Sequence, residues 1–276
     1  MKKPEPLIVV DLFPLLLDGL LELLASLSPS DWQKATVCKD WSVKDLAAHL
    51  LGGDVGILSR KRDGFAFVNK SIDSWAELVA FINELNAVWV QAAGRFSPRL
   101  LCELLRLTGE QVCDYFKTLD PWAVGDPVSW AGDEPAPVWL DLAREYTERW
   151  HHQQQIRDAV QRPGMKEPKF FAPVLDAFVR ALPHTYRNVE ADENTLVTLT
   201  ITGAAGGRWS LLRETQMWNL YLDVERQPDA ELVMDEDLAW RLFTKGVNKD
   251  QAHRVVTFKG DERFALNALN MISVIA

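Results

Sequence analysis

The chain has 276 residues, 47% of them hydrophobic, so it is long enough to bury one large core or two ordinary ones. Its formal net charge of -9 argues against a nucleic acid partner, because binding to a phosphate backbone relies on clustered Lys and Arg. The most apolar stretch, residues 12–27, is interrupted by Asp18 and Glu22, and no signal-peptide pattern opens the chain. We therefore expect a soluble cytoplasmic protein with no membrane partner.

The first 160 residues have the apolar periodicity of helices joined by polar or Pro-containing links. Ser42 and Asp45 form a capping-box pattern, which predicts that a helix starts at about Val43 and carries His49. The Pro- and Gly-rich residues 120–137 are expected to form a long loop. The predicted helices cover residues 9–27, 43 to about 60, 74–93, 98–119 and 138–160.

The period changes after Arg162-Pro163-Gly164, where we place a domain boundary, giving domains over residues 1–163 and 164–276. Residues 196–202 alternate and are rich in β-branched residues, which is typical of a strand. The predicted fold class is an N-terminal helix bundle followed by a separate α+β domain. After a helix over 169–182, we expect strands over 196–202, 209–213, 217–224, 230–234 and 253–259, with helices over 235–245 and from 262 to the C-terminus.

Candidate metal ligands lie on the helix over 138–160. When this helix is projected at 100° per residue, Glu148, His152 and Gln155 share a flank beside the apolar face, whereas His151 points furthest from that face. Glu148 and His152 are four residues apart and can reach one ion from one side. His49 would supply a third ligand, since two imidazoles and a carboxylate suit a divalent ion.

Spacing alone leaves other interpretations open. A lone histidine in an apolar run such as residues 46–51 is often a core residue bonded to a neighbour, and Glu148 with Arg149 could form a solvated pair. Gln155 could orient a ligand or a bound water, or it could be an exposed helix residue. Cys38, Cys102 and Cys113 form no C-x-x-C pair, so we predict buried, reduced thiols and no thiolate metal site.

Two sequence motifs in the first half resemble a known family. They read W-S-V-K-D-L-A-A-H-L over residues 41–50 and E-x-x-x-H-x-x-Q-x-x-D-A over residues 148–159. Both resemble the DinB-like metalloenzyme superfamily and, within it, the mycothiol-dependent maleylpyruvate isomerase family. The resemblance implies a DinB-like four-helix bundle that binds a divalent metal through His49, Glu148 and His152. For this set of ligands we expect zinc first and nickel next.

The second half extends this resemblance. A-E-L-V-M-D over residues 230–235, F-K-G-D over 258–261 and the helices that follow each motif are similar to the sterol-carrier-protein-like domain that these isomerases carry. Thiol-using relatives often place an Arg beside a Gly where the first of these helices ends, and this chain has Lys245 before Gly246. Lysine keeps the charge but lacks the planar fork of arginine. The candidate catalytic residues are therefore Gln155 and Lys245.

Two functions fit these observations. The first is a metal-dependent thiol S-transferase or isomerase, because a metal with open positions can bind a low-molecular-weight thiol as thiolate for attack on a small electrophilic substrate. The second is a non-catalytic protein that binds an apolar small molecule in its sterol-carrier-like half, beside Leu266, Leu269 and Ile272. A homodimer is compatible with either function.

Overall fold

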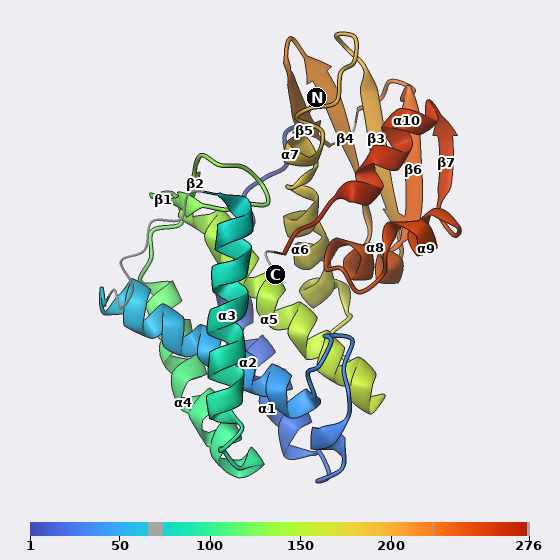
Figure 1. Cartoon of the computed structure of the whole chain (residues 1–276). Coiled ribbons are helices and arrows are strands. Elements are labelled where there is room, and N and C mark those ends of the chain that lie inside the picture. Colours follow the sequence, from blue (N-terminus) through green and yellow to red (C-terminus); the bar gives the residue numbers. More distant parts are fainter. Residues whose placement is uncertain (66–73, 223, 275–276) are drawn as a thin grey trace. The chain divides into compact units, whose positions relative to one another are not determined.

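The chain divides into two compact units in the computed structural model, which describes residues 1–65, 74–222 and 224–274 (Figure 1). The helical unit comprises residues 10–120 and 148–165. The sheet unit comprises residues 1–9, 121–147 and most of the chain after residue 165. The division falls inside one long helix, α5 (Val138–Val160), between Thr147 and Glu148. The predicted boundary after residue 163 stays a prediction.

The helical unit follows the predicted helices closely. It contains α1 (Phe13–Ala25), α2 (Val43–Gly56), α3 (Trp75–Ala93), α4 (Pro98–Lys117) and the second part of α5, as Figure 1 shows in blue to green. A π-helical segment, Ile57–Arg62, continues α2. Serines begin three of these helices, since Ser42, Ser74 and Ser97 each accept a hydrogen bond from the amide three residues later.

The core of the helical unit is made mainly by four helices. Its buried residues include four leucines of α1, Leu101 and Leu105 of α4, and Ile156 and Val160 of α5. Helix α2 contributes its apolar face from Val43 to Leu51, whereas α3 contributes Ala93 to this buried cluster. Burying each large aliphatic side chain contributes roughly 1.5–3 kcal/mol. Packing of α1, α2, α4 and α5 therefore fixes the helices that carry the candidate ligands.

A five-stranded mixed sheet organises the second unit. Its strand order is β5-β4-β3-β6-β7, with β3 and β6 parallel and the other neighbours antiparallel. Five of the seven residues of the central strand β3 are buried, as expected for a strand covered on both faces. The strands are β3 (Leu196–Thr202), β4 (Gly207–Glu214), β5 (Met217–Tyr221), β6 (Ala230–Asp235) and β7 (Thr257–Gly260).

Short helices accompany this sheet, and together they confirm the expected α plus α+β class. Trp209 Nε1 in the sheet donates to Asp176 of the first of these helices, and the Tyr186 hydroxyl donates to the carbonyl of Phe264, which links two helical segments. The helices are α6 (Pro168–Val179), α7 (Leu182–Thr185), α8 (Glu236–Phe243), α9 (Lys249–His253) and α10 (Glu262–Asn267).

The structure corrects several sequence predictions. The predicted loop over 120–137 contains a two-stranded ribbon, β1 (Val124–Pro127) and β2 (Pro135–Pro137). His253 ends the short helix α9 instead of opening a strand, and the helix predicted over 169–182 is split into α6 and α7. The last helix ends at Asn267 and continues only as a 3-10 turn, Ala268–Asn270.

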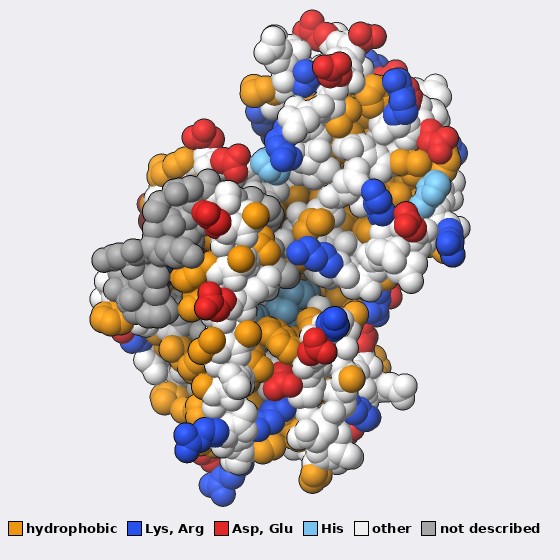
Figure 2. Space-filling view, viewed as in Figure 1, with side chains coloured by type: hydrophobic (Ala, Val, Ile, Leu, Met, Phe, Trp, Pro, Cys, Tyr) orange, Lys and Arg blue, Asp and Glu red, His pale blue; other side chains and the backbone are white. Residues whose placement is uncertain are grey.

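The described surface carries charges of both signs. On the face seen in Figure 2, Lys and Arg side chains are interspersed with Asp and Glu and do not gather into a basic patch. Within the described ranges, none of the helices combines the length and the apolar character needed to cross a membrane.

Candidate metal centre

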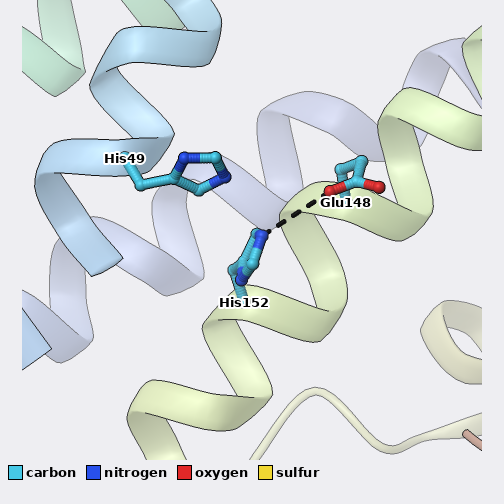
Figure 3. A group of neighbouring side chains, drawn as sticks. All are labelled: His49, Glu148 and His152. Atoms are coloured by element: carbon cyan, nitrogen blue, oxygen red, sulfur yellow. Dashed lines mark ion pairs between the residues drawn. The ribbon is translucent and has the colours of Figure 1, made fainter. Parts of the chain in front are cut away.

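Helix α5 places Glu148 and His152 on the same side, one turn apart. Figure 3 shows the two side chains directed toward each other, with Glu148 Oε2 at 3.5 Å from His152 Nε2. His152 is buried, whereas Glu148 is partly exposed. The spacing of four residues produces this contact, because residues four apart lie one above the other on a helix.

Helix α2 brings His49 to the same point. The predicted capping box is present: Ser42 accepts from the Asp45 amide, and the Asp45 carboxylate accepts from the Ser42 amide, which sets the first turn of α2. Two turns later, the His49 ring lies 4.7 Å from the His152 ring and 5.1 Å from the Trp41 ring. Among the described residues, one ligand atom each of His49, Glu148 and His152 lies within 4.8 Å of the others.

The pKa values of the two histidines are shifted in opposite directions. Burial, and then the nearby charge of His152, lowers the pKa of His49 to about 3, so its ring is neutral. Burial also disfavours the charged form of His152, but its contacts with the Cys38 and Glu148 side chains outweigh this and raise its pKa to about 9. Without a metal, the centre therefore holds an imidazolium beside a carboxylate, and metal binding must displace that proton.

The donor set fits a divalent transition metal. Two imidazole nitrogens and one carboxylate oxygen are ligands that zinc takes at catalytic sites, where three protein ligands leave a position open. Two atoms bound to one zinc ion lie no more than about 4.4 Å apart. Small side-chain rotations bring atoms that already lie within 4.8 Å of one another to such distances.

Gln155 and Cys38 lie on the other side of the His152 ring. Gln155 Oε1 is 2.7 Å from His152 Nδ1, and the Cys38 thiol donates to the same oxygen over 3.3 Å. Gln155 therefore contacts a candidate ligand, and its predicted catalytic role stays a prediction. Sequence reasoning missed Cys38, because a cysteine far from any other cysteine or histidine has no metal-ligand spacing to reveal it.

Two predictions are only partly confirmed. The helical projection directs His151 away from the apolar face, yet the residue is buried and its ring centroid lies 4.0 Å from that of His152. The projection assumed a single buried face, but all five residues from His151 to Gln155 are buried. Of the three cysteines predicted to be buried, Cys113 is buried, whereas Cys38 and Cys102 are partly exposed.

Lys245 belongs to the sheet unit and follows Thr244, the residue that caps the C-terminal end of α8. It is exposed and has a φ of 63°, a left-handed conformation that usually favours glycine. The Gly246 amide then donates to the carbonyl of Arg241 over 2.7 Å, closing the end of the helix. The structure thus gives Lys245 a role in helix termination, and its catalytic role stays a prediction.

Comparisons with solved structures show the fold. A crystal structure titled as a histidine-to-alanine mutant of the mycothiol-dependent maleylpyruvate isomerase is 11% identical, with a TM-score of 0.54 over 96% of this chain and 99% of that chain. A second crystal structure of the mycothiol-dependent maleylpyruvate isomerase is 12% identical, with a TM-score of 0.52 over 88% of this chain and 91% of that chain.

The sterol-carrier likeness of the second half is not established in this way. The sterol carrier protein domain 2 of Helicoverpa armigera matches 39% of this chain with a TM-score of only 0.29, so that likeness stays a prediction.

Sequence comparison identifies the family. Among curated proteins, no match to the chain was found. The family profile described as the mycothiol maleylpyruvate isomerase N-terminal domain matches residues 13–157, more than half of the chain. This range includes α1 to α4, most of α5 and all three candidate ligands. The chain belongs to the mycothiol maleylpyruvate isomerase N-terminal domain family.

Proposed function

We propose that this protein is a divalent-metal-dependent enzyme of the maleylpyruvate isomerase type, which uses a low-molecular-weight thiol to isomerise or conjugate a small electrophilic substrate. The convergence of His49, Glu148 and His152 carries the proposal. Membership of the family supports the thiol and the isomerase chemistry.

In this proposal, His49, Glu148 and His152 hold the ion. A divalent cation bound there would supply Lewis acidity, which favours the ionised form of a thiol or of water at neutral pH. His49 is neutral and needs no deprotonation, whereas His152 gives up the proton that its neighbours favour. The Glu148 carboxylate contributes a negative charge that offsets part of the metal charge.

Lys245 is proposed to bind an anionic group of the substrate. Its ammonium is a compact point charge, so it attracts a carboxylate without the two-point grip of an arginine. Lys245→Ala should therefore raise KM for an anionic electrophile and leave kcat nearly unchanged. A fall in kcat with KM unchanged would contradict this role.

Metal content tests the ligand assignment. Purified wild-type protein should contain stoichiometric metal by elemental analysis, with zinc ahead of nickel, and His49→Ala and His152→Ala should each lose most of it. His253→Ala is a matched control, because His253 is an exposed histidine of the sheet unit. Stoichiometric metal in both ligand variants would overturn the assignment.

Activity tests the reaction class. Metal-loaded protein should catalyse consumption of an activated alkene, such as maleylpyruvate, in the presence of mycothiol or another small thiol, and a chelator should abolish the reaction. Thiol-independent turnover would contradict the thiol part of the proposal. A cytoplasmic location and a homodimer stay predictions from the sequence.

A further inference from the structure

The side-chain amide of Gln155 contacts the Nδ1 edge of the His152 ring. Gln155 lies three residues further along α5, and its Oε1 contacts His152 Nδ1 over 2.7 Å. The opposite ring nitrogen, Nε2, faces Glu148 over 3.5 Å. Gln155 is buried and Glu148 is partly buried, so water competes weakly for their contacts with the two ring nitrogens.

The same amide oxygen receives a second hydrogen bond. The Cys38 thiol donates to Gln155 Oε1 over 3.3 Å. Cys38 lies in a tightly bonded turn, because its amide donates to the Thr36 hydroxyl and its carbonyl accepts from the Trp41 amide. This turn leads directly into the capping box of α2, so the thiol and the helix that carries His49 are positioned together.

Proton positions follow from these two contacts. An amide oxygen only accepts, so a neutral His152 that bonds it must carry its proton on Nδ1 and leave the lone pair of Nε2 toward Glu148. The reversed amide would place NH₂ against Nδ1 and would require the ring proton on Nε2. The reversed amide would also have to donate to the Cys38 sulfur, which is a weak acceptor.

We propose that Gln155 and Cys38 are positioning residues, which hold His152 as its Nδ1–H tautomer with Nε2 free to bind the metal. The tautomer part stands on the hydrogen bonds alone, and the metal part rests on the proposed function. Metal-bound histidines generally donate their second ring N–H to such an outer partner, and loss of that partner weakens metal binding roughly 10- to 100-fold.

Nitrogen NMR of the metal-free protein tests the tautomer. In the neutral ring, which carries a single proton, Nδ1 should be the protonated nitrogen and Nε2 the unprotonated one. Gln155→Leu should shift this equilibrium toward Nε2–H, and Gln155→Glu should preserve the wild-type tautomer, since a carboxylate also accepts from Nδ1. A wild-type Nε2–H tautomer, or a tautomer that Gln155→Leu leaves unchanged, would overturn the proposal.

Gln153→Leu is the matched control. Gln153 lies two residues away on the same helix, is buried, and among the described residues its amide atoms have no hydrogen-bond partner. This variant should retain the wild-type tautomer of His152. An equal shift in Gln153→Leu and Gln155→Leu would mean that any disturbance of α5 moves the proton, which would overturn the assignment to Gln155.

Metal affinity tests the consequence. In chelator competition with Zn²⁺, Gln155→Leu should bind roughly 10- to 100-fold more weakly, whereas Gln155→Glu and Gln153→Leu should bind nearly as tightly as wild type. Cys38→Ala should weaken binding less than Gln155→Leu, and Cys38→Ser, which keeps a donor, should restore it. Wild-type affinity in Gln155→Leu would overturn the positioning role. If wild type bound no zinc, the proposed function would fail, while the NMR result would still decide the tautomer.

Discussion

Arg149 donates a hydrogen bond to Asp54 over 2.7 Å and so links α5 to α2 beside the candidate ligands. The Asp54 carboxylate also accepts from the Thr108 hydroxyl over 3.0 Å, and the Arg149 guanidinium lies 5.7 Å from the Phe13 and Phe116 ring centroids. The side chains of Asp54 and Arg149 are only 7% and 18% exposed, so this ion pair is largely removed from water. It connects the two helices that bring the histidines together.

Asp54→Ala should strongly destabilise the protein. Removing one partner of a buried ion pair leaves an uncompensated charge, which costs about 3–5 kcal/mol. Urea denaturation of the metal-free protein measures this loss. Glu103→Ala is the control, because it breaks the exposed Arg99 ion pair and should cost about 0.5 kcal/mol or less. Equal losses in the two variants would contradict the role of the buried pair.

Ser42→Ala should weaken the start of α2. The variant removes the side chain that accepts from the Asp45 amide, and loss of such a cap costs about 1 kcal/mol. Ser42→Thr keeps the acceptor and should recover most of this free energy of unfolding. The comparison can be made by thermal denaturation, and equal melting temperatures for Ser42→Ala and wild type would show that the cap contributes nothing.

Zinc should stabilise the folded protein. A metal that binds only the native state, at 100 times its Kd, adds about 2.7 kcal/mol to the free energy of unfolding. The effect should disappear in His49→Ala and persist in His253→Ala. Chemical denaturation with and without zinc measures both differences, and equal stabilisation of the two variants would place the zinc elsewhere.

Acid should reduce the contribution of the Asp237 carboxylate to the free energy of unfolding. Partial burial raises the pKa of Asp237, but hydrogen bonds from Arg241, Lys166 and Trp240 outweigh this and lower it well below 3.8. A lowered folded-state pKa means that the stabilisation is present above pH about 4 and is lost as the pH falls through the folded-state value.

Asp237→Asn should therefore destabilise the protein at neutral pH, and its difference from wild type should shrink below pH about 4. The carboxylate is 47% exposed and screened by solvent, so we expect about 1 kcal/mol or less. Urea denaturation at a series of pH values measures this difference. A difference that grows as the pH falls would have the wrong sign.

Lys245→Gly should stabilise the sheet unit. A left-handed conformation such as that of Lys245 costs a non-glycine residue about 1–2 kcal/mol, and glycine removes this cost. Part of the resulting stabilisation is offset by the greater freedom of glycine in the unfolded chain. Lys245→Ala removes the same charge but keeps the strain. Only the glycine variant should melt at a higher temperature, whereas both should share any change in KM. A higher melting temperature in both would assign the effect to charge.

Helix boundaries were predictable where apolar spacing and caps agreed. The sequence predicted α5 over its observed range and the start of α2 at its capping box. The β1–β2 ribbon could not be predicted, because Pro127, Pro135 and Pro137 are typical of a loop. The two strands tolerate these prolines because short edge strands need few backbone N–H donors. Helix α9 has five residues, too few to show a helical period.

The candidate site was predictable only in part. The spacing of Glu148 and His152 could be read from one helix. His49 could be proposed as a third ligand from its residue type, but spacing could not place it beside them, because two distant helices carry no shared pattern. Cys38 and the burial of His151 could not be predicted. The position of Cys38 and the burial of His151 depend on which elements surround α5. A helical projection of α5 contains no information about those neighbouring elements.

The candidate ligands are far apart along the chain, so the metal centre can form only after both α2 and α5 have been synthesised. During synthesis, His49 leaves the ribosome about a hundred residues before Glu148 and His152. Until α5 has emerged and packed against α2, a metal ion would find a single imidazole and would bind weakly. Metal loading therefore follows assembly of the helical unit, and the time at which a refolding chain first retains zinc would mark the docking of α5.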